Sequence, residues 1–233
     1  MTKGKLEKFA EMKTFPNVIE PDFKEIFQKN YKLKGKWRSS FFNNDKPIIL
    51  ELGCGKGEYT VNLARNDPDS NYLGIDIKGA RMWKGAKQAF NDNLQNAAFL
   101  RTRIDFINSF FEEEEVDGIW VTFPDPQPKK AKKRLISSRF LNAYASFLRP
   151  GAPVRLKTDN ANLFEYMKQI IEKNNLPIIK FSEDVHNSTD EELEIIRNIQ
   201  TFYEKQFVEM GKTIKYVSFR LNPSKSLEEP DEE

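Results

Sequence analysis

Acidic side chains and a glycine-rich loop follow successive apolar segments in the first half of the chain. The set comprises Glu51, Gly53, Gly55, Gly57, Asp76 and Asp105. Glycines let the backbone adopt positive φ and pass close to a ligand. A carboxylate at the place of Asp76, after a second strand, can accept both hydroxyls of a ribose. Asp105, after a third strand, could meet the polar edge of an adenine, so the residues predict a site for an adenosine-like ligand.

The spacing of the glycine loop distinguishes two kinds of adenosine ligand. A dinucleotide loop reads Gly-x-Gly-x-x-Gly and holds a pyrophosphate, whereas this loop reads Gly-x-Gly-x-Gly and is preceded by Glu51. An acid beside the loop repels pyrophosphate and suits a cation. S-adenosyl-L-methionine (SAM) carries a sulfonium and an ammonium group and no phosphate. SAM is therefore the predicted ligand, and an NAD-dependent dehydrogenase is the alternative.

A second reactive segment is the loop at residues 123–134, which follows a buried strand. Asp125 stands between Pro124 and Pro126 at its start. Five cations follow, namely Lys129, Lys130, Lys132, Lys133 and Arg134. Prolines fix φ and remove backbone donors, so the segment is a stiff loop. Open α/β sheets place their chemistry at strand ends of this kind. Asp125 is thus a candidate catalytic residue and the lysines are candidate phosphate contacts, against the alternative of a solvated basic loop.

Alternating strands and helices must position these loops. Apolar runs predict strands at residues 47–51, 71–77, 97–101, 118–122, 152–158, 177–181 and 214–221. Helical spacing predicts helices between them, including a long polar helix or helix pair at 191–210. Short links between alternating elements imply an α/β fold. We expect a Rossmann-like, seven-stranded, mostly parallel sheet with an antiparallel last strand and helices on both faces.

Charge is distributed unevenly along the 233 residues. Residues 1–46 hold eleven basic against six acidic residues, a net of +5, and predict a mobile basic arm with irregular or short helical structure. Residues 47–222 form the expected catalytic domain, with a substrate-binding insert at 183–211. Residues 223–233 are expected to be an acidic, disordered tail. Local basic regions in a nearly neutral chain can still bind nucleic acid.

Cysteine and histidine usage limits the chemistry. Cys54 is the only cysteine and His186 the only histidine, so an intrachain disulfide and a Cys/His metal cage are not expected. We expect His186 in an exposed polar loop without a role, and Cys54 as a packing residue. The first residues lack the apolar core of a signal peptide, and no apolar run reaches membrane-spanning length. The expected location is cytoplasmic, with no membrane partner.

Taken together, these motifs closely resemble those of the bacterial tRNA (guanine-N7-)-methyltransferases, class I SAM-dependent enzymes. The resemblance spans residues 48–221 and rests on a combination that is specific although each part alone is not. The parts are Leu50-Glu-Leu-Gly-Cys-Gly-Lys-Gly57, Gly74-Ile-Asp76, Arg103-Ile-Asp105, Phe123-Pro-Asp-Pro126, Lys157-Thr-Asp159 and Thr201-Phe-Tyr-Glu204. Three departures concern Asp76, where the family often has Glu, Gln127, where it commonly has Trp, and residues 129–134, where it has a longer Arg/His-rich run.

The resemblance implies a role for each matching residue. Glu51, Asp76, Asp105 and Asp125 would contact SAM or line its site, with Asp125 catalytic. The substrate RNA and its guanine would be bound by Lys129, Asp159, Thr201, Phe202, Tyr203 and Glu204. Further RNA contacts would come from Lys130, Ala131, Lys132, Lys133, Arg134, Leu135 and Ile136. The partner would be tRNA, methylated in its variable loop, by an enzyme that is a monomer or a homodimer. The alternatives are a methyltransferase for another RNA or a protein, and a non-catalytic RNA-binding module.

Overall fold

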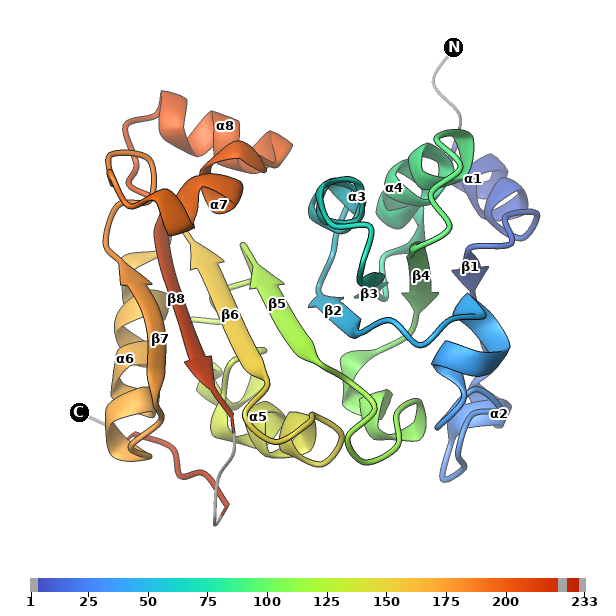
Figure 1. Cartoon of the computed structure of the whole chain (residues 1–233), viewed down its shortest axis with the longest axis horizontal. Helices are drawn as coiled ribbons and strands as arrows, with labels where there is room; N and C mark the ends of the chain where they lie inside the picture. Colours follow the sequence, from blue (N-terminus) through green and yellow to red (C-terminus); the bar gives the residue numbers. More distant parts are fainter. Residues whose placement is uncertain (1–3, 222–225, 231–233) are drawn as a thin grey trace.

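An eight-stranded sheet organises the chain (Figure 1). The structure is a computed structural model that describes residues 4–221 and 226–230. The strands are β1 (Val18–Ile19), β2 (Ile48–Leu52), β3 (Asn71–Asp76), β4 (Ala97–Arg101), β5 (Gly118–Thr122), β6 (Pro153–Thr158), β7 (Ile178–Ser182) and β8 (Lys215–Arg220). Their order across the sheet is β1-β4-β3-β2-β5-β6-β8-β7.

Helices cover both faces of the sheet, as expected. The helices are α1 (Lys5–Met12), α2 (Phe23–Ile26), α3 (Glu58–Asn66), α4 (Gly79–Asn91), α5 (Ser138–Ala145), α6 (Ala161–Lys173), α7 (Glu194–Asn198) and α8 (Phe202–Glu209). Strand side chains alternate between two hydrophobic clusters: Ile119 and Val121 lie in one and Trp120 in the other. The first cluster packs against α5 and α6, and the second against α3 and α4.

The strand directions confirm the predicted fold class, with one correction to the strand count. Every pairing from β1 to β6 is parallel, and β8 is antiparallel to both β6 and β7. The extra strand is β1, which pairs Val18 with Phe99 of β4. After β2 the chain builds outward to β3 and β4, and then returns to place β5 on the other side of β2. This topological switch point is where open α/β sheets form ligand crevices.

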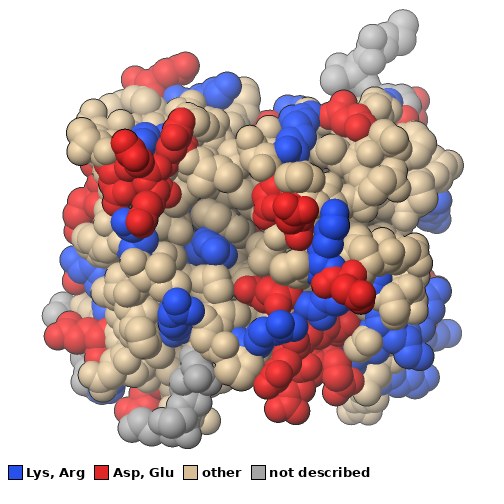
Figure 2. Space-filling view, in the orientation of Figure 1, with Lys and Arg blue, Asp and Glu red and all other residues tan. Residues whose placement is uncertain are grey.

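From Gly4 onward, the described part of the N-terminal segment packs against the rest of the chain. Helix α1 lies beside α4 with Met12 fully buried, and β1 extends the sheet. A π-helical turn, η1 (Trp37–Phe42), buries Trp37, whose indole Nε1–H donates to the Phe110 carbonyl at 2.8 Å. Lys and Arg side chains gather over α2 and the residues after it (Figure 2, lower right). The expected basic character of this segment therefore remains, on a docked structure.

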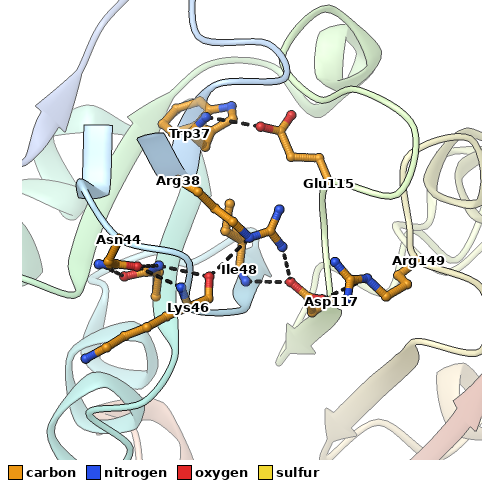
Figure 3. Close-up of polar contacts among 9 residues, drawn as sticks. Trp37, Arg38, Asn44, Lys46, Ile48, Glu115, Asp117 and Arg149 are labelled. Carbon is orange, nitrogen blue, oxygen red and sulfur yellow. Dashed lines mark hydrogen bonds and ion pairs between the residues drawn. The ribbon is translucent and has the colours of Figure 1, made fainter. Parts of the chain in front are cut away.

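Two acids before β5 fasten that segment to the sheet (Figure 3). Glu115 is buried, although the run from Glu112 to Glu115 reads as a solvated turn in the sequence. It accepts hydrogen bonds from the backbone N–H groups of Gly35, Trp37 and Glu112 at 2.8, 3.1 and 2.9 Å. Asp117 accepts from the Ile48 N–H at 2.8 Å and pairs with Arg38 and Arg149. The two carboxylates thus replace the regular hydrogen bonds that this irregular chain lacks.

Part of the C-terminal segment is also ordered, in contrast to the disorder expected there. Leu227 is buried in the core. Glu229 accepts hydrogen bonds from Ser138 of α5 and from the Tyr166 hydroxyl of α6. Residues 223–225 and 231–233 of the predicted tail lie outside the described residues, as does residue 222 at the end of the predicted domain.

The predicted insert is a helix pair between β7 and β8. It consists of a short 3-10 turn, η4 (Glu191–Leu193), followed by α7 and α8 (Figure 1, upper left). Asp and Glu side chains gather over η4 and α7 (Figure 2, upper left). Among the described helices, none is long and apolar enough to cross a membrane.

Removal of the Glu115 carboxylate should destabilise the fold. In a Glu115→Ala variant three backbone N–H groups lose their acceptor, so the free energy of unfolding should fall by about 1–3 kcal/mol. Urea unfolding measures this loss. The matched control is Glu113→Ala, which removes an exposed acid of the same run and should change the stability by less than about 0.5 kcal/mol. Equal effects of the two substitutions would contradict the anchoring role.

Candidate active site

A cleft of about 820 Å³ opens at the carboxyl edge of the sheet. Its wall includes residues that end or follow β2, β3, β4, β5 and β6, and residues of α8. The sequence-predicted residues that line it are Glu51, Gly53, Gly55, Asp76, Asp105, Asp125, Lys133, Leu135, Asp159, Thr201 and Tyr203. Residues from six separate elements of the chain therefore meet at one site.

Glu51 sits at the floor of the cleft, almost fully buried at the end of β2. Its Oε2 accepts from the backbone N–H of Thr60 at 2.8 Å and from the Thr60 hydroxyl. Its Oε1 accepts from the Thr122 hydroxyl of β5 at 2.7 Å. Burial raises the pKa of Glu51 to about 7, although these hydrogen bonds oppose the shift. A nearby cation would favour the ionised form.

The glycine loop and Asp76 are built as one unit. Gly53, Gly55 and Gly57 have φ of +76°, +55° and +70°, in the left-handed region that favours glycine. A Cβ on Gly57 would lie 2.5 Å from the Phe99 ring, so a side chain cannot fit there. The Gly55 N–H donates to Asp76 Oδ2 at 2.9 Å, and the N–H of Lys78 donates to Oδ1 at 2.8 Å. These bonds fix the Asp76 carboxylate at the cleft wall.

Asp105 lies in a 3-10 turn, η2 (Ile104–Ser109), after β4. It forms ion pairs with Arg139 at 2.8 Å and with Arg103 at 3.3 Å. Burial acts to raise the pKa of Asp105, but the hydrogen bonds from these arginines hold it below its ordinary value. Beside it, the Thr102 hydroxyl is buried at the cleft without a partner among the described residues. This orphaned hydroxyl and Asp105 offer hydrogen-bonding capacity to a ligand.

Asp125 is held by a strained loop. Phe123 and Gln127, on either side of it, have φ of 46° and 45°, which non-glycine residues rarely adopt. The Gln127 N–H donates to Asp125 Oδ1 at 3.1 Å. Asp125 itself is exposed at the cleft. Strain of this kind persists where the surroundings enforce it, and here it presents a carboxylate to the cleft.

The basic loop separates into exposed and packed residues. Lys129, Ala131 and the other lysines of the loop are exposed, and Lys133 reaches the cleft. Arg134 is turned inward: its Nε donates to the Pro126 carbonyl at 3.0 Å, and its guanidinium lies 4.2 Å from the centroid of the Tyr166 ring. Leu135 lines the cleft, whereas Ile136 is fully buried in the core, which leaves Ile136 no surface for an RNA contact.

The start of α8 closes the opposite side of the cleft. Thr201 caps the helix through its hydroxyl, which accepts from the Glu204 N–H at 3.1 Å. Phe202 and Tyr203 are exposed, and Lys56 of the glycine loop lies 3.8 Å from the Phe202 ring centroid. The Phe202 N–H also donates to Glu58 of α3 at 2.9 Å. The glycine loop and the insert thus touch across the cleft mouth.

Glu204, in the first turn of α8, is fully buried and lies outside the cleft wall. Its Oε1 pairs with Lys157 at 2.7 Å and with His186 Nε2 at 2.9 Å. Burial lowers the pKa of Lys157, and the Glu204 carboxylate opposes that shift. His186 therefore contacts the buried Glu204 carboxylate, and the prediction that His186 is exposed is wrong. Asp159, at the cleft wall, pairs with Lys212 at 2.6 Å, and its neighbour Asn160 caps α6.

Several residues of the site were not selected from the sequence. They are Lys56, Glu58, Thr60, Thr102, Thr122, Lys157 and His186. Thr122 and Lys157 end buried strands, which was the available signal. Cys54 is buried, and burial raises the pKa of its thiol well above the ordinary value, in agreement with a packing role. No group of acids, histidines or cysteines among the described residues could hold a metal ion.

Known proteins resemble this chain in sequence and in fold. A family model described as "Putative methyltransferase" matches residues 45–217. The tRNA (guanine-N(7)-)-methyltransferase of Bacteroides thetaiotaomicron is 48% identical over 233 residues, which cover 100% of this chain and 92% of that protein. The enzyme of the same name from Porphyromonas gingivalis is 48% identical over 223 residues, covering 94% and 91%. The solved 16S rRNA methyltransferase KamB shares the fold with a TM-score of 0.58 at 16% identity, covering 76% and 89%.

Fold and site together define a class I methyltransferase. The sheet is mostly parallel, its antiparallel strand β8 lies second from one edge, and an acid-lined cleft opens at the switch point. The sequence similarity to the Bacteroides thetaiotaomicron enzyme covers the whole length of this chain and identifies the family within this class. The chain belongs to the tRNA (guanine-N(7)-)-methyltransferase family.

The raised pKa of Glu51 gives a pH-dependent stability. The folded protein holds this proton more tightly than the unfolded chain. The resulting stabilisation is complete below about pH 4.5 and is lost as the pH rises to about 7. A Glu51→Gln variant lacks this term. The stability of the ligand-free wild type relative to the variant should therefore fall by about 3 kcal/mol over that range. Urea unfolding at several pH values, with exposed Glu113→Gln as control, measures the difference; a difference independent of pH would contradict the assignment.

Proposed function

We propose that this chain transfers a methyl group from SAM to N7 of a guanine in the variable loop of tRNA. The observation that carries the proposal is the make-up of the cleft. Acid-bearing strand ends bound one side, and the basic loop and α8 bound the other. Relatives with 48% identity are named for this reaction. A cytoplasmic location and a monomeric or homodimeric state remain predictions that accompany this function.

The donor half of the cleft fits SAM. Buried Glu51 suits a cationic group, and its position beside the glycine loop disfavours a pyrophosphate. Asp76, fixed by two backbone N–H groups, can accept from ribose hydroxyls. The unpartnered Thr102 hydroxyl and Asp105 can meet the polar edge of an adenine. When bound, SAM supplies a methyl group on a positively charged sulfur.

The acceptor chemistry requires little of the protein beyond placement. Guanine N7 offers a free lone pair, so no side chain has to remove a proton before methyl transfer. The main task is to bring N7 and the methyl group into line, which is proximity catalysis. Positive charge develops on the purine as the methyl group arrives. The Asp125 carboxylate, fixed by the Gln127 N–H, can position the base and stabilise that charge.

The substrate half of the cleft offers acceptors to the guanine. Thr201 and Tyr203 face the cleft directly, as does Asp159. Glu204 Oε1 is held by Lys157 and His186, whereas Oε2 is buried without a partner among the described residues. An unsatisfied buried carboxylate oxygen is costly. Oε2 is therefore the atom we propose to accept from guanine N–H groups, once the side chains above it move aside.

Transfer of a tritiated methyl group from SAM to unmodified tRNA tests the proposed function. The expected result is stoichiometric labelling of tRNA, together with SAM binding by calorimetry. Binding of SAM and tRNA without transfer would favour a non-catalytic RNA-binding module. Labelling of rRNA or protein instead of tRNA would redirect the substrate assignment.

Removal of the Asp125 carboxylate should separate binding from catalysis. In Asp125→Ala, the other acids of the donor half remain, so SAM should still bind, while the turnover number falls about 100-fold or more. Single-turnover assays on tRNA measure the loss. Asp45→Ala, a change at an exposed aspartate outside the cleft, is the control and should leave turnover intact. Wild-type turnover by Asp125→Ala would eliminate this role.

The exposed lysines should govern electrostatic affinity for tRNA. Each phosphate contact releases counterions, so a Lys130→Ala/Lys133→Ala variant should bind tRNA more weakly and lower the slope of log Kd against log salt by about 1 to 2. Filter binding at several salt concentrations measures the slope. The control is Lys46→Ala/Arg65→Ala, at the start of β2 and the end of α3, away from the cleft. An unchanged slope in the Lys130→Ala/Lys133→Ala variant would show that these lysines do not contact tRNA phosphates and that the loop is an ordinary solvated surface.

A further inference from the structure

An exposed cluster of phenylalanines lies outside the cleft. Phe23 and Phe27 of the α2 segment are 57% and 48% exposed, and their ring centroids are 5.0 Å apart. The Phe106 ring of η2 meets Phe23 edge-on, with centroids 5.7 Å apart. These three residues form what we call the aromatic patch. Contiguous exposed apolar surface of this kind marks interaction sites.

Local structure holds the two rings outward. Helix α2 has one turn, begun by a capping box between Asp22 and Glu25, and it buries only Ile26 in the core. Phe23 and Phe27, four positions apart, share a side of the turn that points away from the core. Asp22 and Glu25 are engaged in the cap, where the Asp22 N–H donates to Glu25 at 2.8 Å. The fold thus uses Ile26 for packing and leaves the rings to solvent.

The patch adjoins the rim of the cleft. Phe106 follows directly after Asp105, and both Arg103 and Asp105 line the cleft. The Arg103 guanidinium lies 5.9 Å from the Phe106 ring centroid. A macromolecule that presents one nucleotide to the cleft could therefore reach the patch with neighbouring nucleotides.

The charge around the patch favours a polyanionic partner. Residues 1–46, which include Phe23 and Phe27, carry a net charge of +5. Lys24, Lys29 and Lys32 are exposed along the same segment, and Figure 2 shows Lys and Arg gathered there. Exposed rings interleaved with cations are the combination that binds unpaired nucleotides, through base stacking and phosphate contacts.

We propose that Phe23 and Phe27, backed by Phe106, form a stacking platform for unpaired bases of the RNA substrate. The inference rests on the proposed function, because it takes the RNA in the cleft to be the RNA on the patch. Its role is recognition: the platform would hold a second part of the RNA and thereby orient the nucleotide in the cleft. A protein partner or a second copy of this chain is the competing occupant, and it would not require the surrounding positive charge.

The test compares aromatic and aliphatic side chains at the same two positions. The Phe23→Leu/Phe27→Leu variant keeps apolar bulk without a ring face, so its Kd for unmodified tRNA should rise about tenfold. The salt slope of binding should stay unchanged, because stacking releases no counterions. The Phe23→Trp/Phe27→Trp variant should restore affinity. The control is Phe90→Leu on α4, a phenylalanine with the same 48% exposure as Phe27, which should bind tRNA as the wild type does.

The outcomes separate failure of the patch from failure of the proposed function. If wild type methylates tRNA and the Leu variant binds tRNA as tightly as wild type, the platform is wrong and the proposed function stands. If Leu substitution leaves tRNA affinity intact but dissociates a wild-type dimer in sedimentation, the patch is a protein interface and the proposal is overturned. If wild type neither binds nor methylates tRNA, both proposals fall. SAM affinity by calorimetry should be equal in all variants, because none changes the donor half.

Discussion

The Glu51 carboxylate is the interaction on which the site depends. It lies at the end of β2, where the sheet reverses its order, and three hydrogen bonds from Thr60 and Thr122 tie β2 to α3 and β5. Its side chain therefore adds a link between the helix after the glycine loop and the strand that leads into the Asp125 loop. Its burial raises the pKa of Glu51 to about 7. Burial makes the ionised form of Glu51 unfavourable in the empty cleft, and a bound cation offsets that cost. A sulfonium or an ammonium group can therefore gain affinity from Glu51.

The cleft joins two halves that differ in charge and in construction. Under the proposed function, the donor half is built on acid-bearing strand ends and backbone hydrogen bonds. The substrate half is built on loops and the insert, which is fastened from below by the Lys157–Glu204 pair and from across the mouth by Glu58. Rigid positioning of the donor and adaptable holding of a large RNA are different tasks. In the function that we propose, the two halves of the cleft would serve these two tasks, with Asp125 between them.

The sequence predicted features that depend on local pattern. Buried strands are visible in the sequence as apolar runs, and Glu51, Asp76 and Asp105 lie along one cleft because strand ends converge by topology. Strand β1 escaped prediction because two residues, Val18 and Ile19, carry no period. Glu115 looked solvated because two of its three donors, the N–H groups of Gly35 and Trp37, come from an irregular stretch far away in the sequence.

Contacts between residues far apart in the sequence explain why the burial of Glu204 and the contact of His186 were not predicted. Glu204 contacts Lys157 because the insert packs on the sheet, and it also contacts His186. Helical spacing alone could not show that Glu204 is buried while Phe202 is exposed. The ion pair between Arg139 and Asp105 joins α5 to η2 and is likewise not visible in the local sequence pattern. Such contacts depend on tertiary structure, and the pattern of neighbouring residues in the sequence does not reveal them.

The proposed function is tested most directly by identifying the methylated nucleotide after reaction of the purified protein with bulk unmodified tRNA and SAM. Nuclease digestion with mass spectrometry locates the new methyl group. We expect 7-methylguanosine at one guanine of the variable loop. A methyl group on another atom, on another part of the tRNA, or on no tRNA at all would contradict it.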